Sequence, residues 1–343
     1  MMHHEHCTVT NAEGHGNQET SMRTIPLCLA LLIQCVGSVC AEGPNWKKAQ
    51  EYLDSRQKDW YENFTKADRG TGATKTSCLC CHTLVPYGLA MPVIRKQTST
   101  TNLTKYEEQL IKQTRLRVKN WADLDSEKLG LMYEFDEAKK KESWGTEAVL
   151  NCLVLASHDR DSDRTEPHAS TKEEFKHLWS KQENGSWAWL DFRGSSQPWN
   201  FQPWESADGR YFGATLAAVA VGTAPGYYKP GEDETVDTHV KKLREYLRSQ
   251  FANQNLHHRL FALWASTKLS GILKEDETKN LIKELFEKQQ ADGGWNLSQF
   301  GKYRKSYTQS EGTATALVVF ILREAGAASD YGKGEKGMDY WRI

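Results

Sequence analysis

The sequence predicts an all-α protein built as a double layer of helical hairpins. Three observations support this prediction: charged amphipathic helical segments alternate with nearly all-apolar ones, strand-like patterns are scarce, and a Gln–Gly–Trp motif ends two of the amphipathic segments. An amphipathic helix buries one face, whereas an apolar helix must be buried all round. Outer helices that face water and inner helices buried on both sides satisfy both patterns.

Helical periodicity recurs from the first tryptophan-containing segment to near the end of the chain. The amphipathic segments at Thr104 and Thr171 each open with Glu three residues later, which is the spacing of a capping box. The expected helices are Asn45–Asn63, Thr104–Trp121, Gly145–His158, Thr171–Gln182, Arg210–Val221, Val236–Gln250, Leu256–Leu269, Thr278–Gln290 and Glu311–Arg323. Those that begin at Gly145, Arg210 and Glu311 are the most apolar, and we expect them to be buried.

The motif that ends two outer helices is Gln182-Glu-Asn-Gly-Ser-Trp187, and it returns as Gln289-Gln-Ala-Asp-Gly-Gly-Trp295. Glutamine at a helix end can bond the carbonyls left unpaired there, and glycine supplies the left-handed turn that ends the helix. The tryptophan is then expected to pack over the turn against the neighbouring repeat.

These two segments resemble the QW repeats of the squalene-cyclase and protein-prenyltransferase family, and the resemblance covers about Lys172 to Gly326. It implies an α/α toroid, complete or incomplete, over residues 101–330. The stretches 78–87, 144–151 and 211–226 also resemble a group of exported proteins that combine such repeats with an N-terminal c-type haem motif. The chain departs from the family in two respects: the Asp-x-Asp-Asp acid motif of the alkene-protonating cyclases is absent, and Cys152 lacks an obvious Asp/His set for a prenyltransferase zinc site.

The N-terminal part of the chain predicts export. From Met22, one arginine leads an apolar run over 25–39 that ends in small residues, so 22–41 reads as a signal peptide cleaved after Ala41. An uncleaved anchor is the alternative, but the run is short for a membrane span. The stretch 1–21 reads as a leader ahead of the true start. The mature chain then divides into a haem-binding helical segment (42–100), the toroid repeats (101–330) and a C-terminal tail (331–343).

A covalent haem is predicted by Cys78-Leu-Cys-Cys81-His82, which has the C-x-x-C-H spacing of c-type attachment. Thiols three residues apart emerge on one side of a helical turn, so both reach the vinyl groups of one porphyrin. The imidazole of His82 then ligates the iron. Thioether attachment in bacteria occurs outside the cytoplasm, which the predicted signal peptide satisfies. We therefore expect one haem c, bound by Cys78 and Cys81, with His82 as the metal ligand.

Two other uses of these cysteines, zinc binding and a redox disulfide, fit the sequence less well. A zinc site would crowd three thiolates into four positions of the chain. A redox disulfide between Cys78 and Cys81 is typical of a βαβ fold, and the sequence lacks that pattern. Cys80 is left over, either as a buried thiol or as a partner of Cys152, and both alternatives stay open.

The sixth iron ligand is not specified by the sequence. The candidates are Met91, Met132, His158, His168, His177, His239, His257 and His258. We expect His257 or His258 to point into the core, because both lie on a helix whose apolar residues face inward. An open sixth position would imply binding of a small molecule, whereas Met or His would imply electron transfer.

The function expected from these features is a redox role in the periplasm or another exported location. The haem would transfer electrons to a partner protein or oxidise an apolar, isoprenoid-like substrate; no catalytic residue is assigned. The alternative is a terpenoid-cyclase-like or prenyltransferase-like enzyme, or a binding protein, in which the haem is only structural. The net charge of −1 argues against nucleic acid as a partner. No transmembrane segment is expected in the mature chain.

Overall fold

The computed structural model describes residues 45–63, 68–69, 76–77, 79–80, 83–122, 137–191, 208–301 and 308–327. The chain divides into two units, Met1–Glu42 and Gly43–Ile343, and every described residue belongs to the second. The expected leader, signal peptide and C-terminal tail lie outside the described residues.

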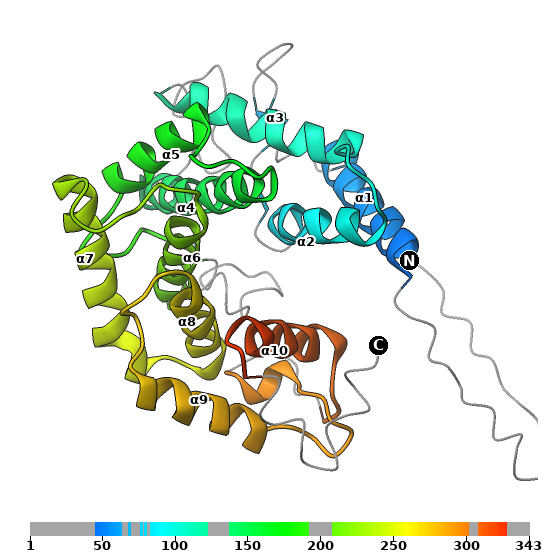
Figure 1. Cartoon of the computed structure of the whole chain (residues 1–343), viewed down its shortest axis with the longest axis vertical. Helices are drawn as coiled ribbons and strands as arrows, with labels where there is room; N and C mark the ends of the chain where they lie inside the picture. The colour runs from blue at the N-terminus through cyan, green and yellow to red at the C-terminus, as the bar shows by residue number, and fades with distance from the viewer. Residues whose placement is uncertain are drawn as a thin grey trace, which may run out of the picture. The chain divides into compact units, whose positions relative to one another are not determined.

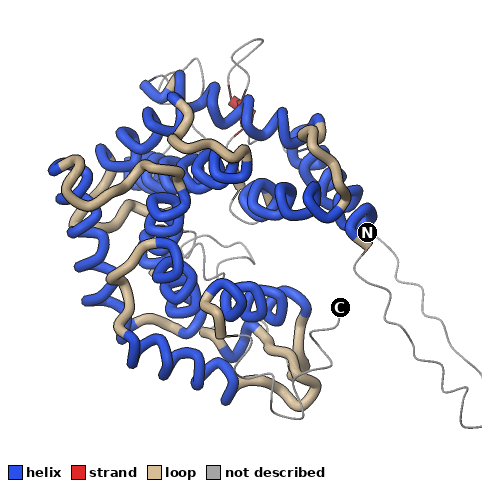
Figure 2. Tube along the Cα trace, viewed as in Figure 1, coloured by secondary structure: helices blue, strands red, loops and turns tan. Residues whose placement is uncertain are grey.

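The described residues are mostly helical, as predicted (Figure 2). The helices are α1 (Trp46–Asn63), α2 (Leu84–Gln97), α3 (Lys105–Lys119), α4 (Glu137–Asp161), α5 (Ala169–Ser180), α6 (Gly209–Thr223), α7 (Glu234–Gln250), α8 (Leu256–Lys268), α9 (Glu275–Glu287) and α10 (Gly312–Glu324), with short 3-10 turns at Phe251–Asn253 and Leu297–Gln299. Strands β1 (Asp68–Arg69) and β2 (Thr76–Ser77) pair antiparallel. Among the described helices, none combines the length and apolar character needed to cross a membrane.

The even-numbered helices form an inner layer in which each packs against the next. Helix α4 contacts α2 and α6, and α8 contacts α6 and α10. Helices α5, α7 and α9 lie along the outer side of this series (Figure 1). The alternation predicted from the sequence is therefore present. Helix α10 differs from the expectation for a fully buried helix, because Phe320 on one of its faces is 43% exposed.

The two predicted capping boxes have different outcomes. At the start of α3, Thr104 accepts from the backbone of Glu107 and the Glu107 side chain accepts in return, so this capping box is confirmed. The one at Thr171 is wrong, because α5 begins earlier and its cap is His168, whose Nδ1 accepts from the backbone N–H of Ser170 at 3.1 Å. Thr171 and Glu174 instead lie within the helix and are fully buried.

Helix α2 was not expected, because its sequence contains two prolines and a glycine. Pro86 lies in the first turn, where a backbone N–H would have no helical partner in any case. A Cβ atom at Gly88 would come within 3.0 Å of Leu110 and 3.4 Å of Val154. The absence of a side chain at Gly88 therefore lets α2 pack closely on α3 and α4, and this tertiary contact outweighs the weak helix propensity.

The two Gln–Gly–Trp turns have closely similar geometry. Gly185 and Gly293 have φ of +85° and +86°, which confirms the left-handed turn. Trp187 and Trp295 are both almost completely buried. Each indole N–H donates to a carbonyl in the last turn of its helix, Trp187 to Leu178 and Trp295 to Leu285, at 2.7 Å in both cases.

The role predicted for the glutamines in these turns is wrong. The Gln182 amide donates to the backbone carbonyl of His239 in α7, and the Gln289 amide donates to Gly293 within its own turn. Tryptophan, not glutamine, bonds the carbonyl at the helix end. The Gln182 side chain therefore connects the end of α5 to α7, the next outer helix.

Candidate functional site

The three residues predicted to hold the haem, Cys78, Cys81 and His82, lie outside the described residues. Their neighbours on both sides are described, at 76–77, 79–80 and from residue 83 onward. The geometry of these flanks therefore shows how the chain holds the ends of the cysteine segment.

The upstream flank is fixed by α3. The backbone N–H of Ser77 donates to Gln113 Oε1 at 3.1 Å, and Arg117 Nη1 donates to Thr76 Oγ1 at 3.1 Å. Thr76 is completely buried and Ser77 is 4% exposed. The two residues ahead of Cys78 are therefore anchored in the interior.

Arg117 is itself held by α4. Its Nε and Nη2 atoms donate to the two carboxylate oxygens of Glu147, each at 2.5 Å, and both side chains are buried. A bidentate guanidinium–carboxylate pair is strong and geometrically specific, and removal of one partner would leave a buried charge unpaired. The pair therefore joins β2, α3 and α4 at one point.

The interior of the motif is also packed. Leu79 and Cys80 belong to the hydrophobic core, and Cys80 is 6% exposed. The Cys80 carbonyl accepts from the backbone N–H groups of Leu84 and Val85, both at 3.1 Å. This residue therefore ties the motif to the first turn of α2, which begins two residues after His82.

Cys80 is a buried thiol of the core. Cys80 and Cys152 are both buried and are not joined by a disulfide. Burial, together with nearby Glu174, raises the pKa of the Cys152 thiol well above its ordinary value. Both residues contribute to the core, which leaves Cys78 and Cys81 as the thiol pair with the attachment spacing.

The candidates for the sixth ligand occupy different environments. Met91 is completely buried in α2, His158 lies near the end of α4, and Met132 lies outside the described residues. Three histidines already use Nδ1: His168 accepts from Ser170, His177 bonds Glu174 and His239 bonds Gln182.

His257 and His258 confirm the expectation of an inward-facing histidine on α8. They are 2% and 0% exposed, and their rings lie among Tyr211, Phe212 and Phe261. Burial, with His258 adjacent, lowers the pKa of His257 well below its ordinary value. The His257 imidazole is therefore neutral at pH 7.

Sequence reasoning missed the residues that hold the flanks. Gln113 and Arg117 resemble ordinary polar residues of an amphipathic helix. Glu147 carried a usable signal, because it is a single carboxylate inside the apolar run 145–156. A charged residue in a segment expected to be buried implies a buried partner.

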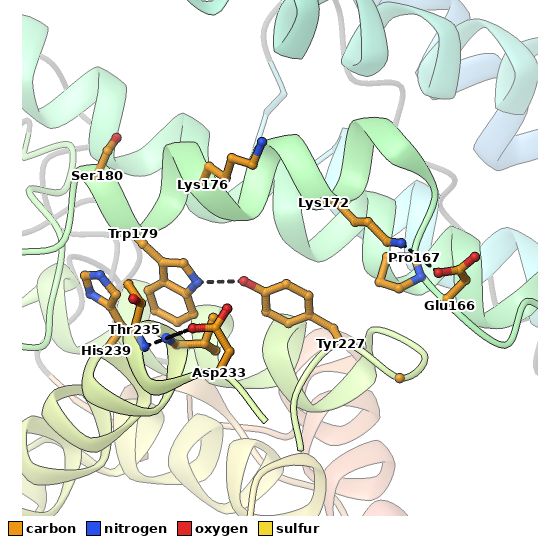
Figure 3. Close-up of a pocket in the computed structure, with 12 residues that line it drawn as sticks. Glu166, Pro167, Lys172, Lys176, Trp179, Ser180, Tyr227, Asp233, Thr235 and His239 are labelled. Carbon is orange, nitrogen blue, oxygen red and sulfur yellow. Dashed lines mark hydrogen bonds and ion pairs between the residues drawn. The ribbon is translucent and has the colours of Figure 1, made fainter. Parts of the chain in front are cut away.

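An open pocket of about 680 Å³ lies between α5 and the start of α7 (Figure 3). Its floor is aromatic: the Trp179 indole donates to the Tyr227 hydroxyl at 2.7 Å, and Tyr227 stacks on Phe175. The charged rim is already paired or capped, since Lys172 bonds Glu166 and Asp233 caps α7. This arrangement favours a structural role for the pocket in joining two outer helices.

Within the described part of the chain, no three His, Cys, Asp or Glu side chains are grouped to hold a metal ion. No protein-family model, no curated protein and no solved structure matches the chain.

Proposed function

We propose that this chain is an exported c-type haem protein with a redox role, carried on a helical repeat scaffold of the α/α-toroid type. The haem would be attached through Cys78 and Cys81, and His82 would ligate its iron. The stacked inner helices and the two matching Gln–Gly–Trp turns support the scaffold part of the proposal.

The observation that carries the proposal is the anchoring of the C-x-x-C-H segment at its upstream flank and at its central residue, Cys80. Thr76 and Ser77 are held by α3, and the Cys80 carbonyl starts α2. The donor set fits a c-type haem, because the Cys80 side chain belongs to the core and two thiols at the attachment spacing remain. A zinc site built on all three cysteines would need Cys80 to leave the core.

The protein's own residues would hold and position the attachment segment. The Arg117–Glu147 pair fixes the upstream flank, and the Cys80 carbonyl bonds the middle of the segment to the first turn of α2. When bound, a haem supplies one-electron chemistry at iron.

The test is expression with an exported leader in a host that matures c-type cytochromes, followed by intact-mass and optical measurements. We expect a chain that begins after Ala41 and is heavier by the mass of one haem. Cys78→Ala and Cys81→Ala should each lose covalent haem. Cys80→Ala is the matched control and should keep it. An unmodified peptide spanning 76–95 in the native chain would contradict the proposal.

A second function, oxidation of an apolar substrate, is favoured by a row of aromatic rings along the inner layer. Phe212 of α6 lies 4.8 Å from Phe261 of α8, measured between ring centroids. Phe261 lies 6.0 Å from Trp264, and Trp264 lies 5.4 Å from Phe320 of α10. The row ends at the exposed ring of Phe320, so an apolar ligand can contact it from solvent.

This second function is tested by binding of farnesol, an isoprenoid alcohol, followed through tryptophan fluorescence. Phe320→Ala should weaken binding, whereas Tyr52→Ala, at a more exposed aromatic residue on α1, should not. Equal binding by the native protein and Phe320→Ala would exclude this surface. Carbon monoxide binding to the reduced haem would show an open iron position, which oxidation chemistry requires and simple electron transfer does not.

A further inference from the structure

A carboxyl group is completely buried on α5, far along the chain from the cysteine motif. Glu174 is 0% exposed, and its Oε2 lies 2.9 Å from His177 Nδ1. Its Oε1 accepts no hydrogen bond from the described residues. An ionised carboxylate in this position would carry a charge with half of its acceptors unsatisfied, so the neutral acid is favoured.

The groups that face Glu174 from the neighbouring helices favour the same form. Helix α4 presents the Glu147 carboxylate, and α3 presents Arg117, which is already paired with Glu147. A second carboxylate beside this pair would leave one negative charge uncompensated. The remaining neighbours are Asn151 and Cys152 on α4 and Glu173 on α5.

Burial and the Glu147 carboxylate accordingly raise the pKa of Glu174 well above its ordinary value of 4.5. The Asn151 amide and the Arg117 guanidinium act in the opposite direction but do not offset these two effects. This agrees with the geometry, in which the carboxyl has one hydrogen-bonded oxygen and no cation of its own.

His177 connects this buried acid to the surface. Its ring stacks on Trp121, with centroids 4.5 Å apart and planes within 6°. The His177 side chain is 14% exposed, and its Nε2 lies 3.8 Å from the half-exposed carboxylate of Glu173. Burial lowers the pKa of His177, so the imidazole is also neutral at pH 7.

We propose that Glu174 and His177 form a buried proton-binding site, in which one proton is shared between Glu174 Oε2 and His177 Nδ1 and exchanges with solvent through the imidazole. Release begins when the carboxyl proton passes to Nδ1 and the Nε2 proton leaves to water. Uptake is the reverse: a proton bound at Nε2 allows the Nδ1 proton to pass to the carboxylate. The imidazole carries both protons only between the two movements and is neutral before and after each complete release or uptake, so protons and charges balance.

The proposal is tested by infrared spectroscopy of the native chain, because a protonated carboxyl has a carbonyl band separate from the amide and carboxylate bands. We expect this band in the folded protein at pH 7 and a shift of the band in D2O. Its absence at pH 7 would overturn the proposal. This measurement needs neither a variant nor a bound haem, so it is independent of the proposed function.

Variants identify the carboxyl group that produces the infrared band and the residue through which its proton exchanges with solvent. Glu174→Gln should remove the band, whereas Glu173→Gln, its exposed neighbour on the same helix, should leave it unchanged. His177→Phe keeps an aromatic ring against Trp121 but has no proton-carrying atoms, so we expect it to slow the D2O shift at least tenfold while the band persists. An unchanged exchange rate in His177→Phe, or a band that survives Glu174→Gln, would overturn the assignment.

Discussion

The indole N–H of Trp187 donates to the backbone carbonyl of Leu178 across 2.7 Å, and this bond closes the end of an outer helix. Trp295 makes the same bond to Leu285 at the end of α9. Each carbonyl also accepts one backbone N–H, from Lys181 and Lys288 respectively, so the indole occupies the second acceptor position of a carbonyl that lies beneath a large ring and away from water. The shared bond explains why tryptophan, rather than another aromatic residue, follows the glycine in both turns.

Replacement of Trp187 or Trp295 by phenylalanine should therefore destabilise the protein. Phenylalanine keeps most of the buried ring but has no N–H, so a buried carbonyl loses one of its two hydrogen bonds, at a cost of about 0.5–1.5 kcal/mol. Urea unfolding followed by circular dichroism measures the change. Trp46→Phe, at the partly buried start of α1, is the control and should change the free energy of unfolding by less than ~0.5 kcal/mol. Equal losses at all three positions would contradict the role of the indole bond.

Two glycines with nearly the same φ allow the cost of left-handed backbone strain to be distinguished from the cost of a steric clash. Gly185 and Gly231 have φ of +85° and +86°. A Cβ at Gly185 would collide with the Lys242 backbone of α7, whereas a Cβ at Gly231 would meet nothing within 4 Å. Gly231→Ala should therefore cost only the left-handed strain, about 1–2 kcal/mol. Gly185→Ala should cost clearly more, and thermal unfolding that ranks the two variants equally would argue against close contact with α7.

Losses of stability caused by substitutions at Arg117 and at Glu147 should not add, because the two side chains form one buried pair. Arg117→Met leaves the Glu147 carboxylate buried without its partner, and the expected loss is about 3–5 kcal/mol. Arg117→Met combined with Glu147→Leu removes both charges and should recover much of that loss. Lys279→Met, in an exposed pair with Glu275, is the control and should cost less than ~1 kcal/mol. Guanidinium unfolding of these three variants and of Glu147→Leu alone would contradict the prediction if the losses of the two single variants at the buried pair simply added in the double variant.

Stability should depend on pH through His257. Its pKa in the folded chain lies below the ordinary 6.5, so near pH 6 the unfolded chain binds a proton that the folded chain does not. The free energy of unfolding should therefore fall as the pH is lowered through 6.5, and His257→Gln should show a smaller fall. Urea unfolding of both proteins at pH 7 and pH 5 tests this, and the opposite contribution of Glu174 cancels in the comparison. The prediction would be wrong if the free energy of unfolding fell by the same amount between pH 7 and pH 5 in the native protein and in His257→Gln.

Helix positions were largely predictable, because burial of one face imposes a period that is visible along the chain. Helix α2 was missed, because Pro86, Gly88 and Pro92 are unfavourable in isolation. The close contact of Gly88 with Leu110 and Val154 is a tertiary effect that local sequence does not encode. The capping box at Thr171 failed for a related reason: the spacing was right, but both side chains are buried within α5.

The haem-attachment motif stays a prediction from the sequence, whereas the described surroundings of its flanks could not be predicted. Spacing alone selects Cys78, Cys81 and His82, since attachment chemistry is local. The groups that hold the flanks come from other helices, and Arg117 reaches Thr76 across 41 positions of sequence. The same is true of Glu174, whose surroundings depend on how α3, α4 and α5 meet.

The two Gln–Gly–Trp turns differ in one contact that affects which part of the protein unfolds first. Gln182 bonds the backbone of α7, whereas the side chain of Gln289, among the described residues, bonds only Gly293 in its own turn. The first turn therefore couples α5 to the following outer helix, while the second contributes no such coupling through its glutamine. In an array stabilised by contacts between neighbours, the less coupled end opens first. Backbone amides of α9 and α10 should accordingly exchange with deuterium before those of α5 and α6, which places the mechanical weak point at the C-terminal repeat.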